Sequence, residues 1–306
     1  MTNNINCILL CAGTGSRMNC DTKNKVCFDI MGKPAVVRVI ENLRECGVKK
    51  FIVVVGNKAE SVMNATSHID GVTYAYQKEQ SGTGNATLCG LKVLNEYGIE
   101  GPVLVVMGDK LIDKSVFKAL IDDFYTKNSD ISLITQPAAF NPSGGKIVVK
   151  DKNIIGIIEN SDLLLLKIRE GLSEGKSLND MYAELELTEK QISKLSVKLS
   201  SMENLTENCY TEINGTRLSS SDITASGVVN CATYLYKRDA INKSILQLKS
   251  DNAQGEFYFT DTVMNIAQTG LVSAVNISDR KLIHTFNTVA ELDLINKFFS
   301  EVGLYE

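Results

Sequence analysis

Two uninterrupted apolar runs, FIVVVG at 51–56 and PVLVVMGD at 102–109, constrain the fold of this chain most strongly. Their β-branched residues do not alternate with polar ones, which is typical of strands buried on both faces of a parallel sheet. Shorter strand-like segments and stretches of helical periodicity alternate with them. Strands are expected at 7–10, 72–77 and 131–136, and helices at 34–46, 58–65, 84–94 and 115–125. This order predicts a Rossmann-like α/β fold with helices on both faces of a central sheet.

The first predicted strand runs into a loop of small residues, LLCAGTGSRM at 9–18. Gly13 and Gly15 allow positive φ angles and a close approach of the backbone to a ligand. We expect a helix to start beside this turn, where its free N–H groups would favour an anion. Arg17 and Lys25 add positive charge, so the combination suits a polyphosphate. A plain strand-to-helix turn is the alternative, and the spacing matches neither a P-loop nor a dinucleotide fingerprint.

Two further polar residues, Gln77 and Asp109, lie at predicted strand ends. The amide of Gln77 precedes a glycine turn and can both donate and accept hydrogen bonds at a base edge. Asp109 ends a very apolar strand, where a carboxylate needs a partner or a metal, and Mg²⁺ is usually bound by one carboxylate together with phosphates and water. A capped turn and a helix-capping aspartate are the structural alternatives. Because ligands of open parallel sheets bind at the carboxyl ends of the strands, we expect all three motifs to share one site.

The composition excludes several classes of protein. The chain has 306 residues, 44% hydrophobic and 22% charged, with a net charge of −4. These values are typical of a globular protein, and the acidic balance argues against a general nucleic-acid binder. No apolar run is long enough to span a membrane, and the N-terminus lacks the basic region of a signal peptide. The eight cysteines form no CxxC pair, which indicates reduced thiols. We therefore expect a cytoplasmic protein without a membrane or nucleic-acid partner.

The second half of the chain departs from the strand–helix alternation. We expect two strands within 146–159, a strand at 228–236 and a C-terminal helix at 289–303, all in a single domain spanning 1–306. Between them, the segment 162–222 is predicted to be a mainly helical insertion.

Part of this insertion, 177–199, is predicted to form two helices, with Thr188 and Gln191 as a capping box. The pattern resembles a helix-turn-helix, but acidic residues outnumber basic ones, so a lid or a homo-oligomer contact is favoured over DNA binding. Its apolar stripes need a surface to bury against. They include Leu163, Leu166, Met181, Leu185, Ile192 and Leu195.

Together these motifs resemble those of the sugar-1-phosphate nucleotidyltransferases, and most of all the uridyltransferase (pyrophosphorylase) domain of bacterial N-acetylglucosamine-1-phosphate uridyltransferase. The resemblance covers most of the chain outside about 160–222. It is carried by LLCAGTGSRM, by KNKVCF around Lys25, by QKEQSGTGNA at 77–86, by MGD at 107–109, by NAQGEFYFTD at 252–261 and by HTFNT around Asn287. The fold that it implies is the three-layer, glycosyltransferase-A-like nucleotidyltransferase fold, whose central sheet is mixed and mainly parallel.

The resemblance also implies a role for each matching residue. The catalytic residues would be Arg17 and Lys25. The nucleotide would be bound by Leu10, Ala12, Gly13, Gly15, Gln77, Gly82 and Thr83. The sugar would be bound by Gly145, by Glu159 in IIEN and by Asn230 in VVN. Mg²⁺ would be held by Asp109 and Asn287.

Three departures from these relatives bear on the substrate and the domain composition. Met107 stands where tyrosine is usual, and the loop PSGGKI at 142–147 is shorter than usual, so the identity of the sugar is open. The acetyltransferase β-helix is missing, which predicts a stand-alone pyrophosphorylase.

The implied reaction joins a nucleoside triphosphate to a sugar-1-phosphate, such as N-acetylglucosamine-1-phosphate, and releases pyrophosphate. UTP is the expected nucleotide, with CTP and dTTP as alternatives in the same chemistry. A non-catalytic regulator that binds nucleotide sugars is the alternative from another class. The shortage of histidines, only His68 and His284, agrees with a reaction that needs no general base.

Overall fold

The computed structural model describes residues 4–303, and the predicted α/β class is confirmed. The centre of the molecule is a block of parallel strands in the order β5–β4–β1–β6. These strands are β1 (Asn6–Leu10), β4 (Lys50–Val55), β5 (Val72–Tyr76) and β6 (Val103–Met107). Every residue of β1 is buried, as is every residue of β4 except Lys50. Burial on both faces explains why these runs lack polar alternation.

Beyond β6 the sheet continues with antiparallel pairs, so that it is mixed. The added strands are β8 (Ile131–Pro137), β9 (Lys146–Lys150), β10 (Asn153–Ile158), β13 (Val228–Tyr236) and β14 (Val272–Asn276). β13 is antiparallel to β6, β8 and β9, whereas β14 is parallel to β8. The register of β13 against β8 breaks between Asn230 and Tyr234, where Ala232 has a φ of 47°. As a result, β13 pairs with β6 only from Thr233 onwards.

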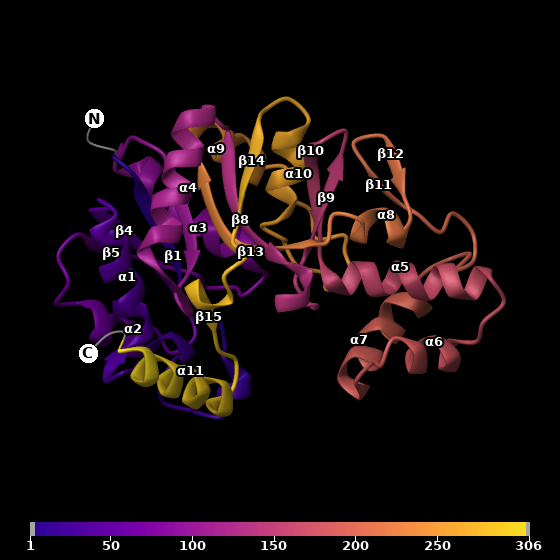
Figure 1. Cartoon of the computed structure of the whole chain (residues 1–306), viewed down its shortest axis with the longest axis horizontal. Coiled ribbons are helices and arrows are strands. Elements are labelled where there is room, and N and C mark those ends of the chain that lie inside the picture. The colour runs from indigo at the N-terminus through magenta and orange to yellow at the C-terminus, as the bar shows by residue number, and fades with distance from the viewer. Residues whose placement is uncertain (1–3, 304–306) are drawn as a thin grey trace.

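Helices cover both faces of the sheet because successive strand residues point to opposite sides. Leu9 faces the layer of α1 (Ala35–Glu45), α2 (Ala59–Thr66), α4 (Lys114–Lys127) and α11 (Val289–Val302). Ile8 and Leu10 face the layer of α3 (Thr83–Glu96), α9 (Arg238–Ile245) and α10 (Asp261–Ala267). The C-terminal helix α11 ends at Gly303, which adopts the left-handed conformation that often terminates helices. Figure 1 shows this helix packed beneath the parallel strands.

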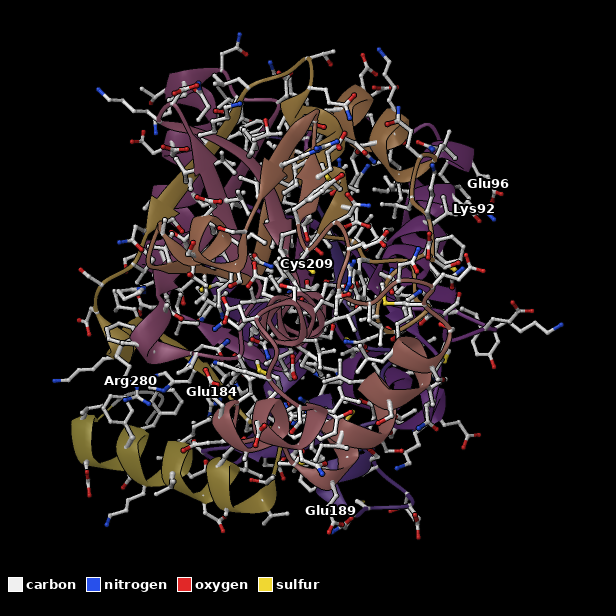
Figure 2. The ribbon with its side chains drawn as sticks, turned by 90° about the vertical axis from the view of Figure 1, so that its right-hand side faces the viewer. Lys92, Glu96, Glu184, Glu189, Cys209 and Arg280 are labelled. Atoms are coloured by element: carbon white, nitrogen blue, oxygen red, sulfur yellow. The ribbon has the colours of Figure 1, made fainter. Side chains whose placement is uncertain are left out.

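The segment between β10 and β13 extends the molecule at one end (Figure 1). It contains α5 (Asn160–Ser173), α6 (Leu178–Glu184), α7 (Glu189–Ser200), β11 (Thr211–Ile213), β12 (Thr216–Leu218) and α8 (Ser220–Thr224). Figures 1 and 2 both show α6 and α7 on the same side of α5. The capping box of Thr188 and Gln191 is confirmed.

The apolar stripes of this segment are buried within the chain itself. Leu163 and Leu166 pack with residues of β9 and β10, including Val148 and Ile158. Met181 and Leu195 pack against the far side of α5, in a second cluster with Ile168. These side chains therefore do not need a partner subunit to cover them.

Three short strand pairs complete the fold. They are β2 (Asp29–Ile30) with β3 (Lys33–Pro34), β7 (Lys110–Ile112) with β15 (Ile283–Thr285), and β11 with β12. Among residues 4–303, none of the helices combines the length and apolar character needed to cross a membrane.

Candidate active site

The glycine loop follows β1 as predicted, but the helix expected beside it is a single 3₁₀ turn, Ser16–Met18. Both residues that flank this turn, Gly15 with a φ of 57° and Asn19 with a φ of 48°, adopt the left-handed conformation. Left-handed residues on either side prevent a longer helix, so the prediction of an adjoining helix N-terminus was wrong. Glycine is required at position 15, because a Cβ there would lie 2.9 Å from the Cβ of Lys25.

Four residues predicted from separate motifs meet beside this loop. The ammonium of Lys25 forms an ion pair with Asp109, and their side chains are only 16% and 11% exposed. Asn287 Oδ1 accepts hydrogen bonds from Arg17 Nη2 at 2.9 Å and from Lys25 Nζ at 3.1 Å. The pairing of β7 with β15 explains the meeting. Asp109 directly precedes β7, and Asn287 follows β15 by two residues, with Thr285 opposite Lys110 in the antiparallel register.

These oxygen atoms are of the kind that Mg²⁺ prefers. The carboxylate of Asp109 and the amide oxygen of Asn287 both contact the ammonium of Lys25, so a cation already lies between them. The described part of the chain has no group of three or more His, Cys, Asp and Glu side chains that could hold a metal alone. The residues therefore fit Mg²⁺ only when phosphate oxygens and water complete its coordination.

Two adjoining clefts, of about 260 and 230 Å³, open at the carboxyl ends of β1, β5 and β6. The first contains the charged residues and is lined by Leu10, Gly13, Gly15, Arg17, Lys25, Asp109 and Asn287, among others. The second is lined by Ala12, Gln77, Gln80, Gly82, Thr83 and Glu256, among others. Leu10, Gly13, Thr14 and Met107 line both. All the residues predicted to bind metal or nucleotide therefore line one continuous surface.

Gln77 in the second cleft is 4% exposed, and its amide orientation is set by its neighbours. Its Nε2 donates to the carbonyl of Gly82 at 3.2 Å and to Asn85 Oδ1 at 3.0 Å. A backbone carbonyl can only accept, so the nitrogen must face Gly82. Within residues 4–303 no group donates to Oε1, which can therefore accept from a ligand. The adjoining residues Gly82 and Thr83 open α3, whose first N–H groups have no partner within the helix. The turn therefore offers an acceptor beside backbone donors.

The segment 252–261 braces this turn from behind. Gly84 N donates to Phe257 O at 2.9 Å, and Phe257 N donates to Ser81 O at 2.9 Å. Gly82 has a φ of 107°, and a Cβ there would lie 2.7 Å from Phe257 O. Glycine is thus required for this close packing.

The three residues predicted to bind sugar form a separate group. Asn230 N donates to Gly145 O at 2.9 Å, and a Cβ on Gly145 would lie 3.3 Å from Glu159 Oε2. The side chain of Asn230 is engaged internally, since its Nδ2 donates to Tyr234 Oη at 2.6 Å and its Oδ1 accepts from Ala232 N at 2.9 Å. None of the three lines the two clefts. These residues are connected to the 252–261 segment by Thr260, whose hydroxyl donates to Glu159 Oε1 at 2.9 Å.

Two acids beside Glu159 were not recognised as site neighbours from the sequence. Asp162 Oδ1 accepts from Ala253 N at 2.8 Å and so ties the first turn of α5 to the 252–261 segment. Burial raises the pKa of both Glu159 and Asp162. Burial also raises the pKa of Asp261 to about 7, with the nearby carboxylates of Asp162 and Glu159 adding to the shift. Three carboxyl groups whose charged forms are disfavoured by burial therefore lie together on the sugar side of the site.

Two further asparagines that the sequence analysis passed over, Asn24 and Asn57, hold the glycine loop in place. Asn24 lies between two lysines and Asn57 between a glycine and a lysine, so both have the sequence context of ordinary exposed loop residues. Only the fold shows that they contact the loop.

The sheet topology, the glycine loop and the cluster of cationic side chains define an α/β protein suited to binding phosphate groups. The chain belongs to the family of MobA-like NTP transferase domains, whose model matches residues 7–169.

Curated relatives are similar to this chain over most of its length. The bifunctional protein GlmU of Geotalea uraniireducens is 28% identical over 292 residues, covering 95% of this chain and 51% of that protein. GlmU of Mycolicibacterium gilvum is 29% identical over 294 residues, covering 93% of this chain and 47% of that protein. The chain thus spans about half the length of these relatives.

Two solved structures share the fold at 15% sequence identity. A UDP-glucose pyrophosphorylase complexed with UDP-glucose has a TM-score of 0.65 and covers 97% of this chain and 99% of its own. A Bacillus anthracis protein described as a glucose-1-phosphate thymidylyltransferase has a TM-score of 0.62 and covers 96% and 94%. Both support the predicted nucleotidyltransferase fold.

Proposed function

We propose that this protein transfers a nucleotidyl group from UTP to a sugar-1-phosphate and releases pyrophosphate. The observation that carries the proposal is the meeting of Arg17, Lys25, Asp109 and Asn287 beside the glycine loop. A module that only binds nucleotide sugars has no need for this arrangement of cations and metal-binding oxygens. The names of the relatives, which include a UDP-glucose pyrophosphorylase, support the same chemistry.

In this proposal an oxygen of the sugar phosphate attacks the α-phosphorus of UTP, and pyrophosphate leaves. The nucleophile is an anion at neutral pH, so the protein has only to position it and to balance charge. Arg17 and Lys25 neutralise the triphosphate and the leaving pyrophosphate. Leu10, Ala12, Gly13 and Gly15 hold the nucleotide along the two adjoining clefts.

Asp109 and Asn287 are the residues that would hold Mg²⁺. Bound there with substrate phosphates, the ion would supply charge neutralisation at the reacting centre. The ammonium of Lys25 contacts both oxygens. When Mg²⁺ binds, Lys25 would move to the phosphates, so Asp109 would face one cation both before and after the metal binds.

The nucleotide base is proposed to be uracil, read by Gln77, Gly82 and Thr83. Oε1 of Gln77 can accept from the N3–H of uracil, while the N–H groups of Gly82 and Thr83 can donate to O4. Cytosine presents a bare N3 and an amino group at these two positions, so both contacts would be mismatched. Thymine has the same edge as uracil, and dTTP therefore belongs in the comparison.

Catalytic efficiency with UTP is expected to exceed that with CTP, ATP and GTP by at least about 10²-fold, because unmatched buried polar groups disfavour the wrong base. Gln77→Leu is expected to reduce the UTP preference over CTP by about tenfold or more. The measurement is kcat/KM for each nucleotide by pyrophosphate release. Asn95→Ala is the control, since Asn95 lies on the same helix and its side chain donates to Asn242 Oδ1, away from the residues that line the clefts. A higher efficiency with CTP, dTTP, ATP or GTP than with UTP would refute the UTP assignment and leave the transferase assignment in place.

Gly145, Glu159 and Asn230 are proposed to contact the sugar. Glu159 would accept hydrogen bonds from sugar hydroxyls, and the same burial that raises its pKa limits the water that could compete for them. N-acetylglucosamine-1-phosphate or a similar hexose-1-phosphate is the proposed acceptor.

The 162–222 insertion is proposed to close over the sugar side of the site or to form a homo-oligomer contact. It touches the segment that braces the base-reading turn, through Asp162 with Ala253 and through an ion pair of Lys198 with Asp251. Replacement of the insertion by a Gly/Ser linker is expected either to raise the KM for the sugar-1-phosphate or to lower the number of subunits in the solution oligomer. The near-isosteric Asp162→Asn variant tests the contact in the intact fold. An unchanged KM and an unchanged oligomeric state would remove both roles.

A further inference from the structure

Asn24 is 1% exposed and lies behind the glycine loop, between three segments of the chain. Its Nδ2 lies 3.2 Å from Cys11 O, 3.1 Å from Gly13 O and 2.8 Å from Asn57 O. Its Oδ1 accepts from Val26 N at 3.2 Å, and its own N–H donates to Ser61 Oγ at 3.0 Å. One side chain thus joins the glycine loop, the turn that carries Lys25 and the connection between β4 and α2.

The carbonyls of Ala12 and Thr14 also accept hydrogen bonds from groups outside the loop. Ala12 O accepts from Asn57 N at 3.2 Å and from Gln80 Nε2 at 2.9 Å, and Thr14 O accepts from Asn57 Nδ2 at 3.3 Å. Every carbonyl from Cys11 to Thr14 is therefore held by a group outside the loop.

This arrangement sets the direction of the loop N–H groups. In a planar trans peptide the N–H points opposite to the preceding carbonyl, so the N–H groups of residues 12–15 point away from the groups that hold those carbonyls. Within residues 4–303, none of these N–H groups donates to a protein acceptor. Successive free N–H groups of this kind form an anion-binding concavity, and Gly13, Thr14 and Gly15 line the first cleft.

We propose that Asn24 is a positioning residue for the triphosphate. By holding the carbonyls of Cys11 and Gly13 it directs the N–H groups of Ala12 and Thr14 at the anion, and by capping the following turn it places Lys25. The inference rests on the proposed function for the identity of the anion. The proposed role of Asn24 does not involve the residues around Glu159 that are proposed to bind the sugar.

The test compares Asn24→Asp and Asn24→Ala with Asn6→Ala. Asn6 is also fully buried and donates to a backbone carbonyl, Glu100 O at 2.9 Å, but it does not line the clefts. Calorimetric Kd values for UTP and for pyrophosphate, both with Mg²⁺, are expected to rise at least about tenfold in both Asn24 variants and less than about twofold in the control. The KM for sugar-1-phosphate is expected to stay within about twofold, and the melting temperatures of the Ala variants to fall by similar amounts.

Measuring the same Kd values over a range of pH separates a positioning role of Asn24 from a general loss of stability. The Asp variant is nearly isosteric with asparagine, so this measurement remains possible even if the Ala variant fails to fold. The carboxyl introduced at position 24 is buried among three carbonyl oxygens, which disfavours its charged form, so lowering the pH favours the protonated form, which can again donate one hydrogen bond to the loop. The affinity of Asn24→Asp relative to wild type is therefore expected to recover toward acid pH, while that of Asn24→Ala stays constant. The proposal is overturned if Asn24→Asp binds pyrophosphate as wild type does at the alkaline end of this range, or if Asn6→Ala loses as much affinity. Absence of turnover in the wild type would instead count against the transferase assignment, since these binding measurements do not require turnover.

Discussion

Asp109→Asn is expected to lower kcat by at least about 10³-fold while the protein remains folded. The carboxylate ends a buried strand, faces the ammonium of Lys25 and lies beside the amide oxygen of Asn287. The amide that replaces it has nearly the same shape but no negative charge, so it would hold Mg²⁺ far more weakly and would lose the ion pair with Lys25.

Pyrophosphate release at several Mg²⁺ concentrations, with a melting curve for each variant, measures this effect. Asp113→Asn is the matched control. Asp113 caps α4 through Ser115 N, and asparagine caps helices equally well. Activity of Asp109→Asn within about tenfold of wild type would exclude Asp109 from the metal site.

Lys25→Met is expected to lower kcat/KM for UTP by about 10²- to 10³-fold, because a preorganised charge next to the phosphates is lost. The side chain of methionine keeps much of the packing over Phe286, whose ring centroid lies 5.7 Å from Lys25 Nζ. The loss should appear in nucleotide kinetics and in inhibition by pyrophosphate, together with a lower melting temperature in the absence of Mg²⁺, because the nearly buried carboxylate of Asp109 loses its ion-pair partner.

Lys23→Met provides the comparison, since Lys23 is more exposed and pairs only loosely with Asp29 at 3.8 Å. It is expected to stay within about twofold of wild type. If both lysine variants lose the same activity, a general effect of surface charge explains the result, and Lys25 has no special role.

The parallel half of the fold could be predicted from the sequence because its strands are local and unambiguous. The runs at 51–56 and 102–109 contain no polar interruptions, and the structure buries them on both faces as β4 and β6. The carboxyl ends of neighbouring strands lie on one edge, so the convergence of Gln77, Asp109 and the glycine loop follows from the topology alone.

The proximity of Asp109 and Asn287, by contrast, could not be predicted from the pattern of the strands. It depends on the pairing of β7 with β15, two strands of three residues each whose partners are far apart in the chain. Neither strand has a pattern that predicts its partner, so family resemblance rather than periodicity indicated this contact.

The error of the sequence analysis about the glycine loop has a local physical cause. The helix expected after the loop is limited to one turn by the left-handed residues Gly15 and Asn19 at its two ends.

The apolar stripes of the insertion were expected to need a surface to bury against. Leu163 and Leu166 find it on β9 and β10, and Met181 and Leu195 find it on the other side of α5. Burial between elements of the same insertion cannot be distinguished by periodicity from burial against a partner.

The most direct test of the proposed function is the reaction itself. Purified protein is incubated with UTP, N-acetylglucosamine-1-phosphate and MgCl₂, and the nucleotide sugar and pyrophosphate are quantified by mass spectrometry and a coupled phosphate assay. The transferase proposal predicts equal amounts of both products, and formation of either only when the sugar phosphate is present. The contradicting result is calorimetric binding of nucleotides or nucleotide sugars without pyrophosphate release from UTP, CTP, dTTP, ATP or GTP with any hexose-1-phosphate, which would identify the protein as a binding module without transferase activity.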